Sequence, residues 1–223
     1  GFEALARWQS PRIGHVSPAE FISVAEHNGR ITMMTRLLLG QALAVARDWP
    51  EDVYLSFNLS PHDVTTPEST LRIVAIVLKS GFDPRRINFE ITETAVMHDF
   101  EQASSIQMLR ELGCGIALDD FGTGYSSLNH VHKLPLTRIK IDGSFVRDIH
   151  TRRTSFKIVK SVLALCAEMD LRAIVEGVET EEELRILEGL GVEAVQGYYF
   201  GKPMAAPETF ALVAKGSVMA AAS

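Results

Sequence analysis

Short apolar runs alternate with longer segments of helical periodicity along this chain of 223 residues. The apolar runs are brief, rich in β-branched or aromatic residues and flanked by breakers, a pattern that predicts strands. Seven segments have this character: 1–8, 54–60, 87–92, 115–118, 138–141, 172–175 and 193–195.

Between these runs, apolar residues recur at the spacing of an amphipathic helix. Helices are expected from about 32 to 49, from 67 to 81, from 100 to 113, around 156–166 and from 180 to 191. Thr66 followed by Pro67 is typical of a helix start, and Thr180 with Glu183 has the spacing of a capping box.

Strands that alternate with helices imply parallel pairing with right-handed crossovers. A closed (β/α)8 barrel and an open doubly wound sheet both fit the length. The sequence contains neither a GxGxxG fingerprint nor a GxxxxGK[ST] loop, so open nucleotide-binding folds lose support. We therefore predict an α/β fold, a modified (β/α)8 barrel whose first strand is expected to precede Gly1.

The composition indicates a globular domain and argues against some classes of partner. Apolar residues make up 46% of the chain and charged residues 22%, as in a globular domain with a sizeable core. The net charge of −6 argues against a nucleic-acid polymer as partner, although a bound cation would still permit a phosphorylated ligand. Cys114 and Cys166 are expected to be free core thiols. Without a signal peptide or a membrane-spanning run, a cytoplasmic domain with no membrane contact is expected.

Polar side chains stand at or near the C-terminal end of every predicted strand, where a (β/α)8 barrel gathers its active site. One carboxylate there could simply cap the next helix. Glu90, however, lies inside an apolar run, where an unpaired charge would be costly to bury. Oxygen donors without histidine or cysteine favour a hard cation such as Mg²⁺ or Mn²⁺. The candidate donors are Glu3, Asn58, Glu90, Asp119, Asp120 and Glu176.

Seven short motifs follow one another along the chain: EALARW at 3–8, NLS at 58–60, EITET at 90–94, DDFGTGYSSL at 119–128, KID at 140–142, EGVET at 176–180 and QGYYFGKP at 196–203. In this order they resemble the motifs of the EAL domain family, bacterial phosphodiesterases that hydrolyse cyclic di-GMP. The segment 17–29 is also similar to the family's helical segment after the first motif. The resemblance implies a single EAL domain over 1–223, trimmed at its N-terminus and taken from a longer signalling protein.

The resemblance also implies a chemistry: two Mg²⁺ or Mn²⁺ ions assist the cleavage of one 3′–5′ bond of cyclic di-GMP to linear 5′-pGpG. One ion is expected to bind four side chains, namely Glu3, Asn58, Glu90 and Asp119. Asp119 and Asp120 are expected at the second ion. Lys140 resembles the residue that holds the attacking water, and Glu176 resembles a metal-side general base or water-orienting carboxylate. Glu179 and Gln196 resemble positions near that water.

Further positions follow from the same resemblance. Arg7 and Leu5 resemble substrate contacts, with a surface ion pair as the alternative for Arg7. The family's regulatory loop, linked to dimerisation and metal binding, corresponds to Phe121, Gly122, Thr123, Gly124, Tyr125, Ser126 and Ser127, and Glu93 resembles its anchor. Expected partners are cyclic di-GMP, a second copy of the chain, and a fused sensor or GGDEF domain in a parent protein that could be membrane-anchored.

Two other functions remain open at this stage. A catalytically inactive relative would act as a cyclic di-GMP receptor or a protein-docking module, and a different metal-dependent barrel hydrolase would act on another substrate. Inactive relatives usually lose a metal ligand or the loop, and this chain retains both, which favours the enzyme. The DFG at 120–122 is also a protein-kinase motif, but the other kinase motifs are absent from the sequence.

Overall fold

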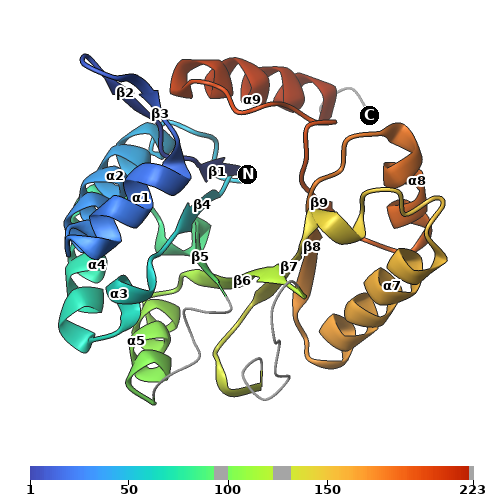
Figure 1. The fold of residues 1–223 in the computed structure, drawn as a ribbon, viewed down its shortest axis with the longest axis horizontal. Coiled ribbons are helices and arrows are strands. Elements are labelled where there is room, and N and C mark those ends of the chain that lie inside the picture. The colour runs from blue at the N-terminus through green and yellow to red at the C-terminus, as the bar shows by residue number, and fades with distance from the viewer. Residues whose placement is uncertain (93–99, 123–131, 221–223) are drawn as a thin grey trace.

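Seven parallel strands form one curled sheet, which makes an incomplete barrel (Figure 1). The computed structural model describes residues 1–92, 100–122 and 132–220. The order in the sheet follows the chain: β1 (Phe2–Ala4), β4 (Leu55–Asn58), β5 (Ile87–Thr92), β6 (Gly115–Phe121), β7 (Arg138–Ile141), β8 (Arg172–Val175) and β9 (Ala194–Val195). The prediction of parallel strands in a modified (β/α)8 barrel is confirmed.

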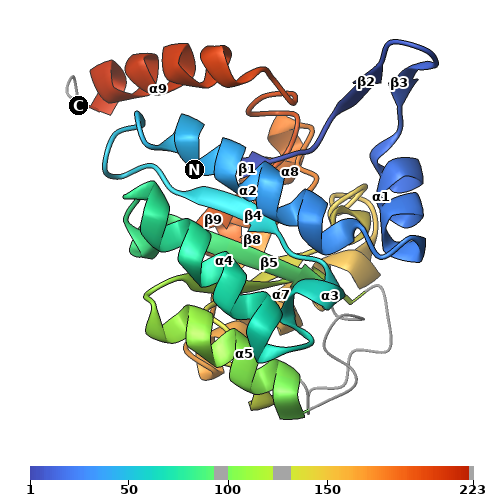
Figure 2. The ribbon, with the colours of Figure 1, turned by 90° about the vertical axis from the view of Figure 1, so that its left-hand side faces the viewer.

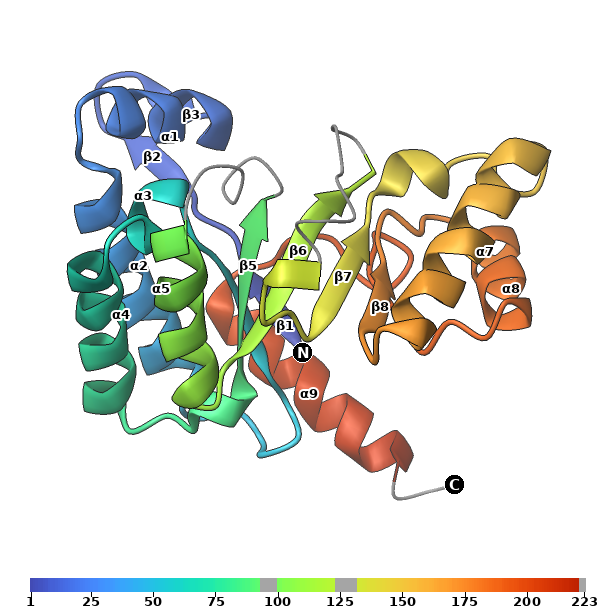
Figure 3. The ribbon, with the colours of Figure 1, turned by 90° about the horizontal axis from the view of Figure 1, so that it is seen from below.

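Helices cover the outer face of the sheet, with one group against β4–β6 and another against β7 and β8 (Figure 3). The helices of the described residues are α1 (Pro18–His27), α2 (Ile31–Ala46), α3 (Pro61–Val64), α4 (Pro67–Ser80), α5 (Phe100–Glu111), α7 (Arg153–Glu168), α8 (Glu181–Gly189) and α9 (Ala206–Ala220). Two 3-10 turns, η1 (Pro84–Arg86) and η3 (Gly143–Phe145), precede β5 and follow β7.

The structure contains the capping interactions that the sequence predicted at the ends of α4 and α8. The Thr66 side chain accepts a hydrogen bond from the Ser69 backbone N–H at the start of α4. This helix ends at Gly81, whose φ of 70° is left-handed. At the start of α8, Thr180 and Glu183 form the reciprocal capping box.

Two clusters of buried apolar side chains hold the layers together. The larger cluster lies between α2, α4 and α5 and the strands β4–β6, with Leu39, Phe89 and Leu109 fully buried. The smaller cluster joins β7 and β8 to α7 and α8 and includes Val159 and Val175. Both cysteines are buried free thiols, as predicted.

The prediction of a single strand over 1–8 is wrong. Strand β1 ends at Ala4, and a separate hairpin follows, in which β2 (Trp8–Ser10) pairs antiparallel with β3 (Gly14–Val16). The Trp8 ring lies edge-on to Phe21 of α1, with 6.0 Å between ring centroids. This contact favours a turn of the chain away from the barrel after β1.

The sheet has two outer strands, β1 and β9, which approach each other but are not paired within the described part of the chain. Helix α9, which the sequence analysis did not predict, lies on this side of the molecule (Figures 1 and 2). The Trp49 indole Nε1 donates to the Thr209 hydroxyl at 3.2 Å, and Phe210 and Val213 pack against the larger core cluster. The last helix thus ties the end of the chain to the first half of the barrel.

Candidate active site

A β-bulge near the end of β6 places two consecutive aspartates at the mouth of the barrel. Leu118 pairs with Ile139, but Phe121 pairs with Ile141, so β6 has one residue more than β7 over this stretch. Adjacent side chains of a regular strand point to opposite faces, and a bulge re-aims one of them. Asp120 occupies the bulge with a left-handed φ of 55°.

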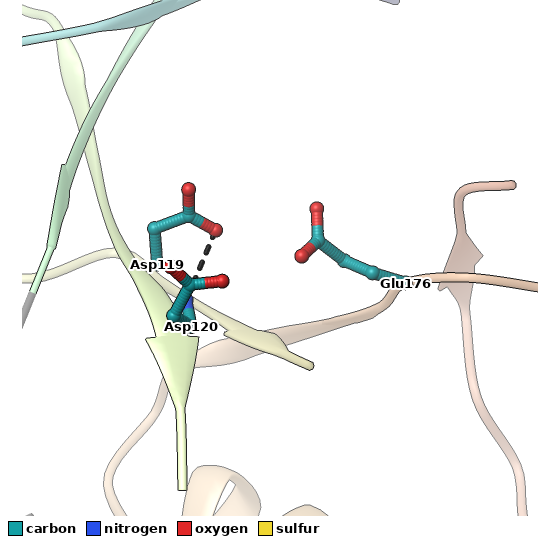
Figure 4. A group of neighbouring side chains, drawn as sticks. All are labelled: Asp119, Asp120 and Glu176. Carbon is teal, nitrogen blue, oxygen red and sulfur yellow. Dashed lines mark hydrogen bonds between the residues drawn. The ribbon is translucent and has the colours of Figure 1, made fainter. Parts of the chain in front are cut away.

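The bulge brings both aspartates close to a third carboxylate. Ligand oxygens of Asp119, Asp120 and Glu176 all lie within 4.8 Å of one another. Figure 4 shows these three side chains at the rim, with Glu176 approaching from the end of β8. The backbone N–H of Asp120 donates to the Asp119 carboxylate at 3.1 Å, which fixes the two residues relative to each other.

Lys140 lies at the middle of the site, with its side chain only 2% exposed. Its ammonium Nζ is 2.7 Å from Glu90 Oε2, 2.8 Å from Glu176 Oε1 and 3.1 Å from Asp119 Oδ1. A carboxylate oxygen of Glu3 is 3.7 Å away. One buried cation therefore contacts carboxylates from β1, β5, β6 and the end of β8. We call Glu3, Glu90, Asp119, Asp120 and Glu176 the acidic centre.

Glu3 joins the first and the last strands of the sheet. The Asn58 amide Nδ2 donates to Glu3 Oε1 at 2.7 Å, and the Gln196 amide Nε2 donates to Glu3 Oε2 at 2.7 Å. Charge-assisted hydrogen bonds of this length are among the stronger ones in proteins. The side chain of Glu3 is thereby oriented from both sides.

Burial changes the protonation of the acidic centre. Desolvation raises the pKa of Glu90 to about 8 and the pKa of Glu176 to about 7, although the nearby ammonium opposes both shifts. Burial and the negative charge of Asp119 raise the pKa of Asp120. For Lys140, burial alone would lower the pKa, but the surrounding carboxylates outweigh burial and raise it. Lys140 therefore stays charged at neutral pH.

The donor set suits a hard divalent cation. Four carboxylates lie 2.7–3.7 Å from the Lys140 ammonium, and a fifth, Asp120, lies beside Asp119 and Glu176, so the centre carries excess negative charge that a cation would neutralise. Glu90 Oε1 is buried and accepts no hydrogen bond from the residues that the structure describes. Such an atom is costly unless a partner binds it. Carboxylate and amide oxygens are the ligands that Mg²⁺ and Mn²⁺ prefer.

Other predicted positions lie further out. Arg7 and Leu5 are exposed beyond the end of β1, and the Arg7 guanidinium donates to the Ala6 carbonyl at 2.9 Å. Glu179 is exposed, and its backbone N–H donates to the capping carboxylate of Glu183.

The predicted regulatory loop is only partly within the described residues. Phe121 is buried at the end of β6, and Gly122 follows it with a φ of 99°. The remaining positions lie outside the described residues; they are Glu93, Thr123, Gly124, Tyr125, Ser126 and Ser127.

A polar layer lies below the acidic centre, and the sequence analysis missed it. The Arg138 guanidinium donates to Asn88 Oδ1 at 2.7 Å, and the Asn88 amide donates to the Ser56 hydroxyl at 3.2 Å. A Cβ on Gly115 would meet the Arg138 guanidinium and the Asn88 amide, so a side chain there would displace this hydrogen bond. The sequence contained a signal for this layer. Asn88 precedes Glu90 by two positions in β5, and Arg138 precedes Lys140 by two positions in β7, so each pair shares one face of its strand.

The fold and the site define a class: a parallel barrel-type α/β protein with an acidic, cation-suited centre at the carboxyl ends of its strands. The sequence model of the EAL domain family matches residues 1–203. This chain belongs to the EAL domain family.

Relatives and solved structures agree with this assignment. The protein named cyclic di-GMP phosphodiesterase RocR, from Pseudomonas aeruginosa, is 36% identical over 211 residues, which are 92% of this chain and 53% of RocR. The solved structure described as PaMucR phosphodiesterase in complex with c-di-GMP superposes with a TM-score of 0.86 at 32% identity, over 93% of this chain and 86% of that chain. A manganese and cyclic di-GMP complex of Klebsiella pneumoniae BlrP1 gives a TM-score of 0.75 at 33% identity, over 87% and 50% of the two chains.

Several curated relatives are much longer than this chain, which spans about a quarter of their length. One of them, the oxygen sensor protein DosP of Escherichia coli, is 36% identical over 213 residues, or 93% of this chain and 27% of DosP. None of the helices in the described ranges is long and apolar enough to cross a membrane.

Proposed function

We propose that this chain is a cyclic di-GMP phosphodiesterase that opens one 3′–5′ phosphodiester bond and releases linear 5′-pGpG. The observation that carries the proposal is the acidic centre, in which four carboxylates contact the buried ammonium of Lys140 and a fifth, Asp120, lies beside Asp119 and Glu176. Membership of the EAL domain family and the names of its relatives supply the substrate class.

Two divalent ions, Mg²⁺ or Mn²⁺, would be held by the acidic centre together with Asn58. When bound, such ions activate water and stabilise the negative charge that develops on a phosphodiester under attack. The manganese in the BlrP1 complex supports this choice of metal. The side chains that would hold the ions are Glu3, Asn58, Glu90, Asp119, Asp120 and Glu176.

Lys140 and Glu176 would act on the attacking water. Their side chains are 2.8 Å apart at the rim, so both can contact one small molecule there. In the metal-free protein the pKa of Glu176 is about 7, and a bound cation would favour its carboxylate form, which suits Glu176 as a general base or as the group that orients the water. The water oxygen bonds to phosphorus, the bond from phosphorus to O3′ breaks, and a proton ends on O3′.

Remaining assignments complete the proposal. Arg7 and Leu5, exposed beyond β1, would contact the substrate, and Glu179 and Gln196 would lie on the water side. The loop at 121–127, with Glu93 as its anchor, would regulate metal binding through a homodimer. A sensor or GGDEF domain fused to this EAL domain in a longer cytoplasmic or membrane-anchored protein would supply the input signal.

The test is hydrolysis of cyclic di-GMP by the purified protein in defined Mg²⁺ or Mn²⁺, with chromatographic detection of linear 5′-pGpG. Asp119→Asn and Asp120→Asn are expected to abolish turnover while the far-UV circular dichroism stays unchanged. Asp170→Asn is a matched control, because Asp170 has the same φ of 55° as Asp120. Asp170 precedes β8, whereas the acidic centre lies at the other end of this strand, where Glu176 follows it. Binding of cyclic di-GMP without product would instead identify a receptor, and near-normal activity of Asp119→Asn would refute the proposed site.

A further inference from the structure

The ring of Phe145 lies against the α-carbon of Gly122. A Cβ built on Gly122 would be 2.8 Å from Phe145 Cε2 and 3.0 Å from Cζ, closer than real Cβ atoms pack. Gly122 follows β6 directly, and Phe145 is the last residue of η3, the turn after β7. The contact therefore joins the two loops that follow neighbouring strands at the mouth of the barrel.

This contact lies two residues from Asp120. Asp120 and Gly122 both have positive φ values, 55° and 99°, on either side of Phe121. Phe121 is held in place by its pairing with Ile141 in β7. The conformation of the bulge is costly for an aspartate, so the neighbouring structure must hold it.

Phe145 is itself firmly placed. The Asp142 side chain caps η3 by accepting from the Ser144 backbone N–H at 3.0 Å. The next residue, Val146, is fully buried, and Phe145 packs partly buried against the smaller core cluster, which includes Val175 and Val178. The Phe145 ring thus connects the smaller core cluster to Gly122, the residue that directly follows β6.

We propose that Phe145 is a positioning residue for Asp120: its ring fixes the backbone at Gly122 and so holds the Asp120 carboxylate beside Asp119 and Glu176. This inference rests on the proposed function only in that Asp120 binds a divalent ion. Phe145 does not touch the reacting atoms, and its effect reaches the site through the backbone of residues 120–122.

The test is a titration of the nucleotide-free protein with Mn²⁺, followed by electron paramagnetic resonance. Phe145→Ala is expected to weaken one Mn²⁺ site by about tenfold, the effect typical of losing a group that orients a ligand, and to leave the other site nearly unchanged. Phe145→Leu, which keeps an apolar contact, is expected to restore most of the affinity.

Phe156→Ala is the matched control. Phe156 is also a partly buried phenylalanine packed on the smaller core cluster, but it lies on α7. We expect it to lower thermal stability without changing either Mn²⁺ affinity. If Phe145→Ala and Phe156→Ala change Mn²⁺ binding equally, or if folded Phe145→Ala binds Mn²⁺ as the wild type does, the proposal is refuted.

Gly122→Ala changes the other partner of the contact between Gly122 and the Phe145 ring. The added methyl group meets the Phe145 ring at a backbone position that disfavours any side chain, so it is expected to weaken the same Mn²⁺ site. If Phe145→Ala does not fold, this variant decides the question, and wild-type affinity would overturn the proposal. Because the titration contains no nucleotide, a wild-type protein that binds Mn²⁺ but fails to hydrolyse cyclic di-GMP would refute the proposed function alone.

Discussion

The most unusual residue of the site is Lys140, a buried ammonium in contact with four carboxylates. Removing one partner of a buried ion pair leaves charge without compensation, so the centre is sensitive to this side chain. The sequence placed Lys140 at a strand end beside the other candidates. It could not reveal that one ammonium contacts four of them, because the contacts join segments that lie far apart in the chain.

Lys140→Met is expected to lower kcat by about a hundredfold or more, the range typical of lost proton-transfer or water-orienting groups. Mn²⁺ binding is expected to persist or tighten, because the variant removes a positive charge from the centre. Steady-state kinetics together with the Mn²⁺ titration measure both. Loss of both Mn²⁺ ions would contradict the assignment of Lys140 to water rather than to metal.

Glu176→Gln is expected to lower kcat far more than it lowers affinity for cyclic di-GMP. The pKa of Glu176 is about 7 without metal, and a bound cation would lower it, so the wild-type rate should rise with pH at some point below about 7, and the variant should lack this rise. The pH profile of kcat and a calorimetric binding constant test the two expectations. Equal losses in rate and affinity would count against a role at the water.

At the scale of elements, local sequence signals correctly predicted the helix ends that they determine. The caps at Thr66 and Thr180 and the left-handed Gly81 are short-range signals, and helices α4 and α8 begin or end accordingly. The hairpin of β2 and β3 was missed because each strand has only three residues, too few for periodicity. The bulge at Asp120 was missed because it exists only in the register with β7. Helix α9 could have been predicted from Pro207 and Glu208 at its start.

Helix α9 contributes to stability through the core side chains that it covers. Phe210→Ala is expected to lower the free energy of unfolding by about 2 kcal/mol, because Phe210 packs partly buried against the larger core cluster. Leu212→Ala on the same helix is the control, since Leu212 is 43% exposed and should change stability by about 0.5 kcal/mol or less. Chemical denaturation followed by circular dichroism measures both, and equal effects would contradict the packing of α9 on the barrel.

For the whole molecule, the acidic centre should make stability depend on pH and on bound metal. Folding raises the pKa of Glu90 from 4.5 to about 8 and the pKa of Glu176 from 4.5 to about 7. Between pH 4.5 and each raised value, the folded chain therefore holds a proton that the unfolded chain has released. Stability falls with rising pH wherever the folded state binds more protons. We therefore expect the metal-free protein to become less stable from about pH 5 to pH 8.

Divalent ions should reverse this trend, because they bind the deprotonated carboxylates and so gain affinity as pH rises. At pH 8, Mn²⁺ at about a hundred times its dissociation constant should add about 2.7 kcal/mol to the free energy of unfolding. EDTA should remove both this increment and the activity, and added Mn²⁺ should restore them. Thermal melts over the pH range test the linkage, and a metal-free protein that gains stability with pH would contradict it.

The hydrogen bond between Glu3 and Gln196 spans 193 positions of the sequence and joins the two ends of the sheet, from β1 to the residue that follows β9. Ribosomes make polypeptides from the amino end, so Glu3 emerges long before Gln196 is added. A nascent or prematurely terminated chain can build most of its core but lacks the donor that orients Glu3. The acidic centre therefore becomes complete only after translation has passed β9, and truncated products should be deficient in the proposed ion binding even where they fold.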